Sequence, residues 1–364
     1  MRTALYTGDI FRLQGRGGIT RYFTEVIPRL ERPAEVLVGL HQSDELAGLG
    51  PRARHALRIP AFRGSARLAA PWNSLLDRAL LGGRRDVVLH PTYYRDPHGL
   101  PRSVPLVLTV YDLTHERFPA IARRRWWGRR DPAVHKAALC ARADRVVCIS
   151  QATRRDVVEL LGVPPEKTRV VLPAGRDWAT IPAVAVAGLV LPFLLWVGER
   201  HSYKNFLRTL EAWAACPEAA GTMLLCIGGG RFRPDEIARL AALGVTARVR
   251  QAGCPDPQLR WAYEHAAGLL YTSLWEGFGL PVLEALSLGC PVVASDLSAL
   301  PEAGGEEAIY VEPGSAGSIQ EGIRRCLAEG ARPASRVAAR RAQAARFSWD
   351  ACAAGLEAVY RELD

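Results

Sequence analysis

At 364 residues the chain is long enough for two domains, each with a core of its own. Apolar residues make up 49% of it, which excludes an intrinsically disordered protein. The formal net charge of +10 favours anionic partners, and nucleotides, phosphorylated lipids, a membrane surface and nucleic acid all stay open.

The first half of the chain alternates short apolar runs with longer helical patterns, which is typical of parallel βα units. The pattern predicts helices over Thr20–Leu30 and Ala152–Leu161, with Ser150 capping the second. The predicted strands are Ala4–Thr7, Val36–Leu40, Val87–His90, Leu106–Val110, Val146–Ile149 and Arg169–Leu172.

A glycine-rich loop, Gly15–Ile19, follows the first predicted strand. Thr20 stands where the third glycine of a dinucleotide-binding GxGxxG motif would fall, so the signal for that motif is weak. Gly17 and Gly18 still leave backbone N–H groups open at a helix start, and neighbouring arginines add positive charge. These features favour a phosphate contact over a plain tight turn.

The middle of the chain contains an uncharged, mostly apolar run, Ile181–Gly198, that is long enough to be a transmembrane candidate. Prolines and a glycine interrupt it, so we interpret it as the end of a linker, residues 173–192, followed by a strand. The N-terminus lacks the apolar stretch of a secretory signal. The eight cysteines show no CxxC pair, which favours a reducing, cytoplasmic location and argues against structural zinc.

The second half repeats the alternation more clearly, which predicts a second doubly wound sheet. The predicted strands are Phe193–Val197, Met223–Ile227, Val249–Ala252, Gly268–Tyr271, Val292–Ser295 and Ala308–Val311. The predicted helices are Phe206–Ala215, Asp235–Leu243, Gln258–Ala266, Pro281–Leu288 and Ala316–Glu329.

Ligands of doubly wound sheets bind at the carboxyl ends of the strands, so the loops there are the places to look for chemistry. In the loop that starts at Gly198, Arg200 and Lys204 are suited to bracket a diphosphate, although a solvated basic loop is the simpler reading of these two residues alone. A later turn, Gly228–Gly230, can approach a ligand with bare backbone.

Two carboxylates, Glu276 and Glu284, flank a Gly-Phe-Gly-Leu-Pro loop and the first turn of a predicted helix. The glycines allow close approach of the backbone, and Pro281 suits the start of a helix. Such a helix start attracts phosphate, and Glu284 can accept hydrogen bonds from ligand hydroxyls. The alternative is an ordinary strand-to-helix connection with two solvated glutamates.

Taken together, these segments resemble the retaining, nucleotide-sugar-dependent glycosyltransferases of the GT-B fold, in the family-4-like group that carries an E-x7-E motif, and within it the polysaccharide mannosyltransferases. The resemblance covers most of the chain. It rests on ADRVVCIS at Ala143–Ser150, RVVLPAG at Arg169–Gly175, WVGERHSYKNF at Trp196–Phe206, GGG at Gly228–Gly230, EGFGLPVLEALSLGCPVVAS from Glu276 to Ser295, LPE at Leu300–Glu302 and the closing FSWDACAAGLEAVYREL.

The resemblance implies an α/β protein with two doubly wound Rossmann-like domains that face a central cleft. It implies an acceptor-side domain over residues 1–172, a linker over 173–192, a donor-binding domain over 193–346, and a last helix, 347–364, packing back on the first domain. It also implies a glycosyltransferase that needs no metal and no cofactor beyond its nucleotide-sugar co-substrate.

The same resemblance assigns roles to residues that match the motifs. Arg200 and Lys204 are expected to hold the donor diphosphate, Glu276 the donor sugar and Glu284 the ribose. The implied donor-binding set is Gly17, Gly18, Gly198, Arg200, Lys204, Gly229, Gly230, Glu276, Gly277, Phe278, Gly279, Leu280 and Glu284. The implied catalytic set is Glu276, Arg200, Lys204, Asp112 and His115.

One departure concerns the end of the fourth predicted strand, where many relatives have histidine followed by aspartate and this chain has Tyr111-Asp112. His115 in the same loop and His90 after the preceding strand are candidates to supply an imidazole, and a structural histidine is the alternative for each. The acceptor-side candidates are Tyr93, Tyr94, Tyr111, Asp112 and His115.

An arginine-rich segment with two tryptophans, Arg123–Arg130, suits an anionic membrane surface, and a solvated helix is the alternative. The predicted activity is transfer of a sugar, from a donor such as GDP-mannose, to a glycan or lipid-linked glycan during polysaccharide synthesis. An epimerase or phosphorylase of the same fold is the first alternative. A basic nucleic-acid-binding protein is another, although no such motif is present.

Overall fold

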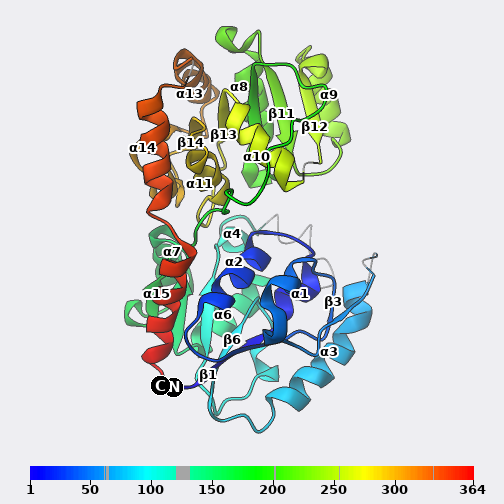
Figure 1. The fold of residues 1–364 in the computed structure, drawn as a ribbon, viewed down its shortest axis with the longest axis vertical. Coiled ribbons are helices and arrows are strands. Elements are labelled where there is room, and N and C mark those ends of the chain that lie inside the picture. Colours follow the sequence, from blue (N-terminus) through cyan, green and yellow to red (C-terminus); the bar gives the residue numbers. More distant parts are fainter. Residues whose placement is uncertain (61, 63–64, 120–131, 201, 254, 331) are drawn as a thin grey trace. The chain divides into compact units, whose positions relative to one another are not determined.

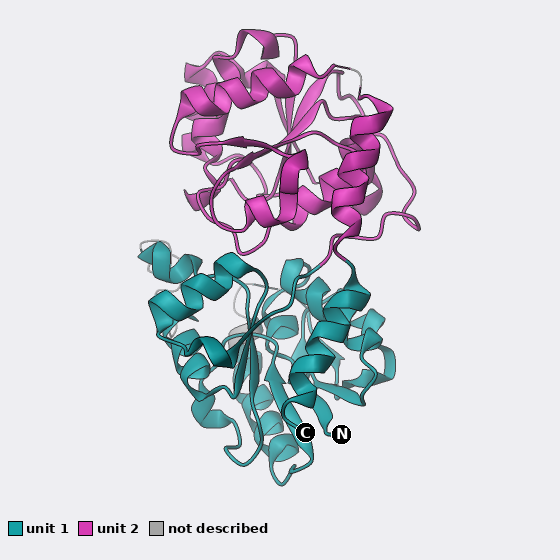
Figure 2. Ribbon diagram, turned by 90° about the vertical axis from the view of Figure 1, so that its left-hand side faces the viewer, with its two compact units in different colours: residues 1–173, 348–364 teal, residues 174–347 magenta. Residues whose placement is uncertain are grey.

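A computed structural model of the chain describes residues 1–60, 62, 65–119, 132–200, 202–253, 255–330 and 332–364. Contacts divide the chain into two compact units, which Figure 2 colours separately. Unit 1 comprises Met1–Pro173 and Ser348–Asp364, and unit 2 comprises Ala174–Phe347. Each unit is described by itself.

Unit 1 is built on parallel strands (Figure 1). Four of them pair in the order β4-β2-β1-β6, and three more pair in the order β7-β8-β9. A bridge between Leu89 and Leu106 connects the two sets. The strands are β1 (Thr3–Thr7), β2 (Ala34–Leu37), β4 (Ala53–Arg54), β6 (Val87–Pro91), β7 (Val107–Val110), β8 (Arg145–Cys148) and β9 (Thr168–Val170), and β3 (Leu40–His41) pairs with β5 (Leu57–Arg58) beside them.

Helices cover this sheet, and their ends follow ordinary capping chemistry. The hydroxyl of Ser150 accepts a hydrogen bond from the N–H of Thr153 at the start of α7, as predicted, and Gly162 ends that helix at φ 64°. The helices of unit 1 are α1 (Asp9–Leu13), α2 (Gly18–Val26), α3 (Ser65–Leu81), α4 (Thr114–Arg117), α6 (Pro132–Arg142), α7 (Gln151–Leu161) and α15 (Trp349–Arg361), with 3-10 helices at Ile27–Arg29, Glu45–Arg52, Pro97–Gly99 and Pro165–Lys167.

The last helix, α15, completes the core of unit 1 although it lies at the far end of the sequence. Its Tyr360 hydroxyl is 2.5 Å from the hydroxyl of Tyr6 and 2.6 Å from Nδ1 of His90. Its Glu357 carboxylate accepts hydrogen bonds from the backbone N–H of Arg32 at 3.0 Å and from Nε of the same residue at 2.9 Å. This buried ion pair fixes the helix against the sheet.

Unit 2 contains a six-stranded parallel sheet in the order β12-β11-β10-β13-β14-β15. The chain therefore runs outward to one edge from β10, then returns to the other side of β10 to start β13. Such a reversal of strand order is the usual ligand site of a doubly wound sheet. The strands are β10 (Phe193–Val197), β11 (Met223–Ile227), β12 (Val249–Ala252), β13 (Gly268–Tyr271), β14 (Val292–Ser295) and β15 (Ile309–Val311).

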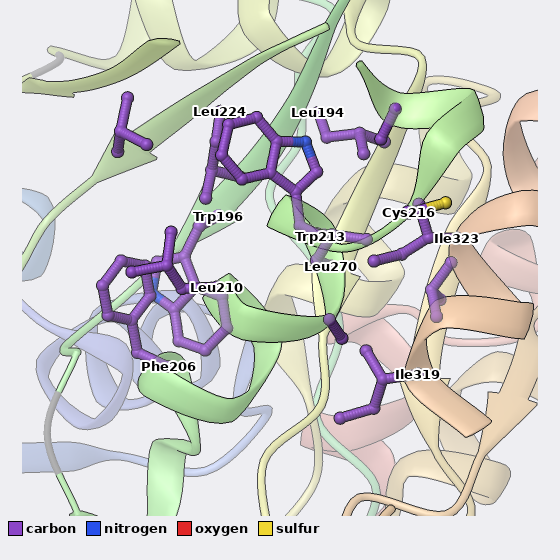
Figure 3. Close-up of a cluster of buried hydrophobic side chains, with 14 of the residues drawn as sticks. Leu194, Trp196, Phe206, Leu210, Trp213, Cys216, Leu224, Leu270, Ile319 and Ile323 are labelled. Atoms are coloured by element: carbon purple, nitrogen blue, oxygen red, sulfur yellow. The ribbon is translucent and has the colours of Figure 1, made fainter. Parts of the chain in front are cut away.

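A dense apolar core lies between this sheet and its helices. Figure 3 shows Trp196 of β10 beside Phe206 of α8, and their rings are 5.1 Å apart in an edge-to-face arrangement. Leu224, Leu270 and Ile323 join the same cluster. The helices of unit 2 are α8 (Phe206–Ala214), α9 (Pro234–Ala242), α10 (Asp256–His265), α11 (Leu280–Ser287), α12 (Leu300–Gly304), α13 (Ala316–Ala328) and α14 (Ala334–Ala345), with 3-10 helices at Ser202–Lys204, Pro217–Ala219, Thr246–Arg248 and Gly305–Glu307.

The segment predicted as a linker, residues 173–192, lies almost entirely in unit 2 and is attached to it. Trp178 is buried, and its carbonyl accepts a hydrogen bond of 2.8 Å from Arg260. The N–H of Val184 donates to the carbonyl of Pro257 at 3.0 Å. The apolar run that begins at Ile181 is irregular up to β10, and no helix among the described residues is long and apolar enough to span a bilayer.

Candidate functional site

The predicted residues Lys204 and Glu276 meet where the strand order of unit 2 reverses. Lys204 lies in the loop after β10 and Glu276 in the loop after β13, and Lys204 Nζ is 2.6 Å from Oε1 of Glu276. Burial acts to lower the pKa of Lys204, but the carboxylate of Glu276 outweighs it and the pKa lies well above the usual range of lysine. Lys204 therefore stays a cation at any physiological pH.

The backbone around this pair is held in an unusual conformation. Four described residues other than glycine have a left-handed φ. Two of them, Ser202 and Asn205, lie in the loop that carries Lys204, and a third, Ser298, lies in the loop after β14. Asn205 donates to the carbonyls of Thr272 and Pro313 at 3.0 and 2.8 Å. Ser298 accepts the N–H of Glu276 at 3.0 Å. Such conformations gather at sites where geometry is constrained for function.

Helix α11 begins at Leu280, four residues after Glu276. Gly279 precedes it at φ 111°, a value that favours glycine, and a Cβ there would come within 2.6 Å of Leu300. The side chain of Phe278 is buried against Phe347, with the ring centroids 5.5 Å apart, so this side chain is closed to a ligand. The first N–H groups of an eight-residue helix thus lie next to the Lys204–Glu276 pair in the chain.

Glu284 lies on α11 and is only 4% exposed. Its Oε2 accepts a hydrogen bond of 3.2 Å from the hydroxyl of Tyr263, and its Oε1 is 4.0 Å from Nε of Arg176. Arg176 also pairs with Asp256. Burial together with the neighbouring Glu284 raises the pKa of Tyr263, which therefore stays a hydrogen-bond donor to the carboxylate. Sequence reasoning missed Tyr263, Arg176 and Ser298, because nothing in their local pattern marks them.

Arg200 lies in the same loop as Lys204. Its guanidinium is buried and donates to the carbonyls of Gly228 at 2.6 Å and Gly230 at 2.8 Å, while Nε pairs with the buried Glu236 at 3.2 Å. The side chain therefore shapes the Gly228–Gly230 turn. Its expected role at the donor diphosphate stays a prediction.

The glycines of these loops lie where positive φ is needed. Gly198 has φ 123°, and Gly228, Gly229 and Gly230 have φ 92°, 69° and 67°. A Cβ on Gly229 would come within 2.8 Å of the Arg200 guanidinium. A side chain at this turn would therefore displace the arginine that holds it.

In unit 1, the predicted phosphate loop lies at the start of α2. Gly18 is the first residue of this helix and is exposed, and Gly17 precedes it in an extended conformation. Arg16 is exposed and lies 3.8 Å from Asp44. The loop is therefore an open helix start with positive charge beside it.

The acceptor-side candidates of unit 1 separate into buried and partly exposed residues. Tyr111 and Tyr94 are buried: Tyr111 donates to the carbonyl of Thr92 at 3.1 Å, and the hydroxyl of Tyr94 accepts the N–H of Tyr111 at 3.1 Å. Tyr93, Asp112 and His115 are partly exposed.

Asp112 lies two residues before helix α4 and bonds to its first residue. Its Oδ1 accepts the N–H of Thr114 at 2.9 Å. Burial acts to raise the pKa of Asp112, but Lys136 and this hydrogen bond lower it overall. The carboxylate is therefore ionised near neutral pH.

His90 is a structural histidine. It is fully buried, its Nδ1 is 2.6 Å from Tyr360, and its Nε2 is 2.9 Å from the hydroxyl of Thr109. Burial lowers its pKa to about 3, so the imidazole is neutral at physiological pH. Of the two candidate histidines, only His115 is thus open to a functional role.

Two further expectations were a membrane contact of the arginine-rich segment and a reaction without a metal ion. The arginine-rich segment Arg123–Arg130 lies outside the described residues. Within the described part of the chain, no group of three or more His, Cys, Asp or Glu side chains is arranged to hold a metal ion.

Two family models match successive parts of the sequence. Residues 16–174 match "Glycosyltransferase Family 4", and residues 192–329 match "Glycosyl transferases group 1". The first match lies in unit 1 apart from its last residue, and the second lies in unit 2.

Curated relatives are glycosyltransferases as well. The chain is 27% identical to the O-antigen chain mannosyltransferase B of Escherichia coli over 94% of its own length and 88% of that protein. It is 32% identical to the D-inositol 3-phosphate glycosyltransferase of Acidothermus cellulolyticus over 71% of its own length and 62% of that protein.

Solved structures share the fold over the whole chain. HepE of Anabaena, determined in complex with UDP and glucose, matches with a TM-score of 0.73 at 19% identity, covering 100% of both chains. Sucrose-phosphate synthase of Thermosynechococcus elongatus also matches with a TM-score of 0.73, at 20% identity, covering 99% of this chain and 98% of that one. The predicted GT-B class of two doubly wound Rossmann-like units is thereby confirmed, and the chain belongs to the family-4-like glycosyltransferases of the GT-B fold.

Proposed function

We propose that the protein transfers a sugar from a nucleotide-sugar donor to a glycan or lipid-linked glycan acceptor in polysaccharide synthesis, with retention at the anomeric carbon. The observation that carries this proposal is the Lys204–Glu276 ion pair, 2.6 Å long, at the strand reversal of unit 2. A strand reversal is where doubly wound sheets bind nucleotides. The start of α11, which follows Glu276 in the chain, supplies N–H groups suited to phosphate.

In this proposal, different residues of unit 2 bind different parts of the donor. Lys204 and the first N–H groups of α11 neutralise the diphosphate, which is the leaving group. Glu276 accepts hydrogen bonds from the sugar hydroxyls, and Glu284 accepts them from the ribose. Tyr263 orients Glu284, because its hydroxyl already occupies one carboxylate oxygen at 3.2 Å.

The chemical step is a substitution on one face of the sugar. The bond between the anomeric carbon and the phosphate oxygen breaks, the acceptor oxygen bonds to the same carbon from the same face, and the acceptor proton passes to the leaving phosphate. No carboxylate nucleophile is required in this route. Positioning and charge stabilisation supply the rate, and Lys204 is the group that meets the developing negative charge.

Product stereochemistry, measured by NMR of the anomeric proton, tests the proposal. We expect the product to keep the anomeric configuration of the donor. Inversion at that carbon would overturn the same-face step and the roles assigned to the leaving phosphate.

The donor we favour is GDP-mannose, since one relative, which matches 94% of this chain, is an O-antigen chain mannosyltransferase. Thermal-shift measurements with GDP-, UDP-, ADP- and dTDP-sugars test this choice, because a ligand that binds only the folded state raises the apparent stability by mass action. A larger shift with UDP-sugars would replace GDP-mannose while leaving the reaction type intact.

We further propose that the reaction needs no divalent metal and that the Arg123–Arg130 segment contacts an anionic membrane. Lys204 and the helix start take the place that a metal ion has in other phosphate-leaving reactions. Turnover should therefore be unchanged by a chelator.

The proposed membrane contact has its own test. Reversing the charge of Arg123–Arg125 should weaken binding to anionic vesicles, and unchanged binding would rule out that contact.

A further inference from the structure

The first residues of unit 2 pack against α11, the helix that carries Glu284. Gly175 lies so close to this helix that a Cβ on it would be 3.4 Å from Cβ of Leu283 and 3.6 Å from the backbone nitrogen of Glu284. Gly175 belongs to the segment predicted as a linker, residues 173–192. The start of that segment is therefore part of the surroundings of Glu284.

Arg176 in this segment lies beside the carboxylate of Glu284. Its Nε is 4.0 Å from Oε1 of Glu284, while the hydroxyl of Tyr263 donates to Oε2 at 3.2 Å. The two oxygens of one buried carboxylate thus face two different side chains. A carboxylate that is held at both oxygens keeps one orientation, and so it is ready for a ligand before the ligand binds.

Two neighbours hold Arg176 in turn. Its guanidinium pairs with Asp256, the first residue of α10, and its Cζ lies 5.2 Å from the centre of the Trp178 ring. The ring of Trp178 packs edge-to-face on Tyr263, with 5.9 Å between the ring centroids. The contacts therefore form a closed ring that runs from Glu284 through Tyr263, Trp178 and Arg176 back to Glu284.

This geometry favours a role in positioning over a role in stability. At 4.0 Å the Arg176–Glu284 pair is longer than a hydrogen bond, although both side chains are mostly buried, at 14% and 6% exposed. A well-packed apolar side chain often stabilises a fold as well as such a pair does. A cation at this place is of use when the carboxylate must accept hydrogen bonds from a ligand in one fixed direction.

We propose that Arg176 is a positioning residue of the donor site, which holds the carboxylate of Glu284 toward the ribose hydroxyls. Asp256 and Trp178 hold Arg176 for this purpose. The proposal rests on the proposed function, in which Glu284 binds the ribose. It adds that affinity for the ribose depends on a side chain of the predicted linker. Nucleotide binding should in turn restrain this segment, because coupling between two sites is reciprocal.

Nucleotides with and without ribose hydroxyls test the proposal, because they isolate the contact that Arg176 supports. In calorimetric titrations of the full chain, Arg176→Gln should raise the Kd of GDP by about five- to twentyfold. The 2′,3′-dideoxy form of GDP lacks both hydroxyls and should bind the variant and the wild type within about twofold of each other. This second titration also shows that the variant is folded.

A double-mutant cycle shows whether Arg176 acts through Glu284. Glu284→Gln should lose the preference for GDP over the dideoxy form, and adding Arg176→Gln should then change the Kd of GDP by less than about twofold. Asp256→Asn leaves Arg176 without its anchor and should show a smaller loss of the same kind. Arg324→Gln is the matched control, because Arg324 pairs with Glu321 on the exposed side of α13 and should leave both Kd values unchanged.

Hydrogen exchange reports on the segment itself. Exchange within residues 175–184 should slow when GDP binds the wild type, and it should slow less when the dideoxy form binds. In Arg176→Gln the two nucleotides should have the same effect on this segment. A segment that responds equally to both nucleotides in the wild type would contradict the proposed coupling.

Two further results would overturn the proposal alone. Arg176→Gln could bind GDP as the wild type does, or it could lose affinity for GDP and the dideoxy form equally. A third result would reach further. If Glu284→Gln loses affinity for both nucleotides equally, Glu284 does not bind the ribose, and the proposed division of the donor fails together with the role of Arg176. Sugar transfer with retention is tested separately by product stereochemistry.

Discussion

The two units share one plan, a parallel sheet covered by helices, but they differ in what they place after the strands. In unit 2 these loops hold Lys204 and Glu276 in a short ion pair that is partly open, with side-chain exposures of 14% and 11%. In unit 1 the ends of the strands and the loops after them hold His90, Tyr94 and Tyr111, which are buried and hydrogen-bonded. This part of unit 2 thus holds charged groups, whereas this part of unit 1 holds aromatic and imidazole groups that pack in the core.

The contrast suggests that charged side chains at the strand ends indicate a ligand site more reliably than aromatic side chains do. A partly open charged pair can still bind a ligand, whereas a buried imidazole or phenol has its hydrogen bonds satisfied by the fold. Breaking each group in turn should therefore affect stability in unit 1 and ligand binding or turnover in unit 2. Five predictions follow this division, from the largest effect to the smallest.

Removal of the buried carboxylate of Glu357 in unit 1 should have the largest effect, a loss of folding stability. Glu357→Ala removes the buried partner of Arg32, whose side chain is 0% exposed, and leaves only the partly exposed Asp364 at 3.4 Å, so it should lower the free energy of unfolding by about 3–5 kcal/mol. Glu362→Ala is the control, because Glu362 pairs with Arg145 and Arg169 at the surface and should cost under about 1 kcal/mol. Urea unfolding measures both. Equal losses would show that α15 is not fixed by the buried pair.

In unit 2, Glu276→Gln should act on turnover. Loss of the negative charge frees Lys204 from its ion pair and removes an acceptor for the sugar, so kcat should fall by about a hundred- to a thousandfold. The Kd of the free nucleoside diphosphate should change by less than about threefold. Glu321→Gln, an exposed position on α13, is the control. A large rise in that Kd would instead assign Glu276 to the nucleotide.

Glu284→Ala should act on nucleotide binding itself. Loss of hydrogen bonds to a charged acceptor costs about 1.5–3 kcal/mol, so the Kd of the free nucleoside diphosphate should rise by about ten- to a hundredfold. A nucleotide that lacks both ribose hydroxyls should bind the variant and the wild type equally. Equal loss of free-nucleotide affinity in Glu284→Ala and Glu276→Gln would show that the two carboxylates do not divide the donor.

Acid should destabilise unit 1 through His90. The folded pKa of about 3 lies below the ordinary value of 6.5, so the unfolded chain takes up a proton at a pH where the folded chain does not. This contribution to stability is complete above about pH 6.5 and falls by up to about 1.4 kcal/mol per pH unit toward pH 3. NMR of the imidazole should show a neutral ring at pH 5. A ring protonated there would contradict the buried assignment.

The smallest effect is expected at Tyr111. Tyr111→Phe removes the hydrogen bond to the carbonyl of Thr92 and should cost about 0.5–1.5 kcal/mol of stability, with kcat unchanged. Loss of turnover without loss of stability would show that Tyr111 takes over the role of the histidine that many relatives have at this position.

The architecture of unit 2 was predictable from the sequence almost residue by residue. Five of its six strands begin and end where predicted. Four of these, β10, β11, β13 and β14, are short, mostly apolar runs buried in a parallel sheet, and the fifth, β12, is a partly buried edge strand. Unit 1 was less predictable. The predicted strand Val36–Leu40 is divided into β2 and β3, because Gly39 adopts φ 70° between them.

Helix α3 and the environment of Arg200 could not be predicted for physical reasons. Pro71 lies inside α3, and three of its large apolar residues, Leu68, Trp72 and Leu75, are exposed, so neither composition nor periodicity indicates a surface helix. Arg200 looks like a ligand-binding cation in the sequence. Its partners are backbone carbonyls at Gly228 and Gly230, which carry no sequence signal.

The packing of α15 also bears on how the protein is made. Unit 2 is inserted into unit 1, because the chain leaves unit 1 at Pro173 and returns only at Ser348. During synthesis the sheet of unit 1 therefore emerges first but lacks its last helix until Ser348–Asp364 has been made, roughly 10–40 s later at the usual rate of chain growth. Unit 2 is complete before then. Unit 2 can therefore fold completely before unit 1 does, although the first strands of unit 1 are made earlier.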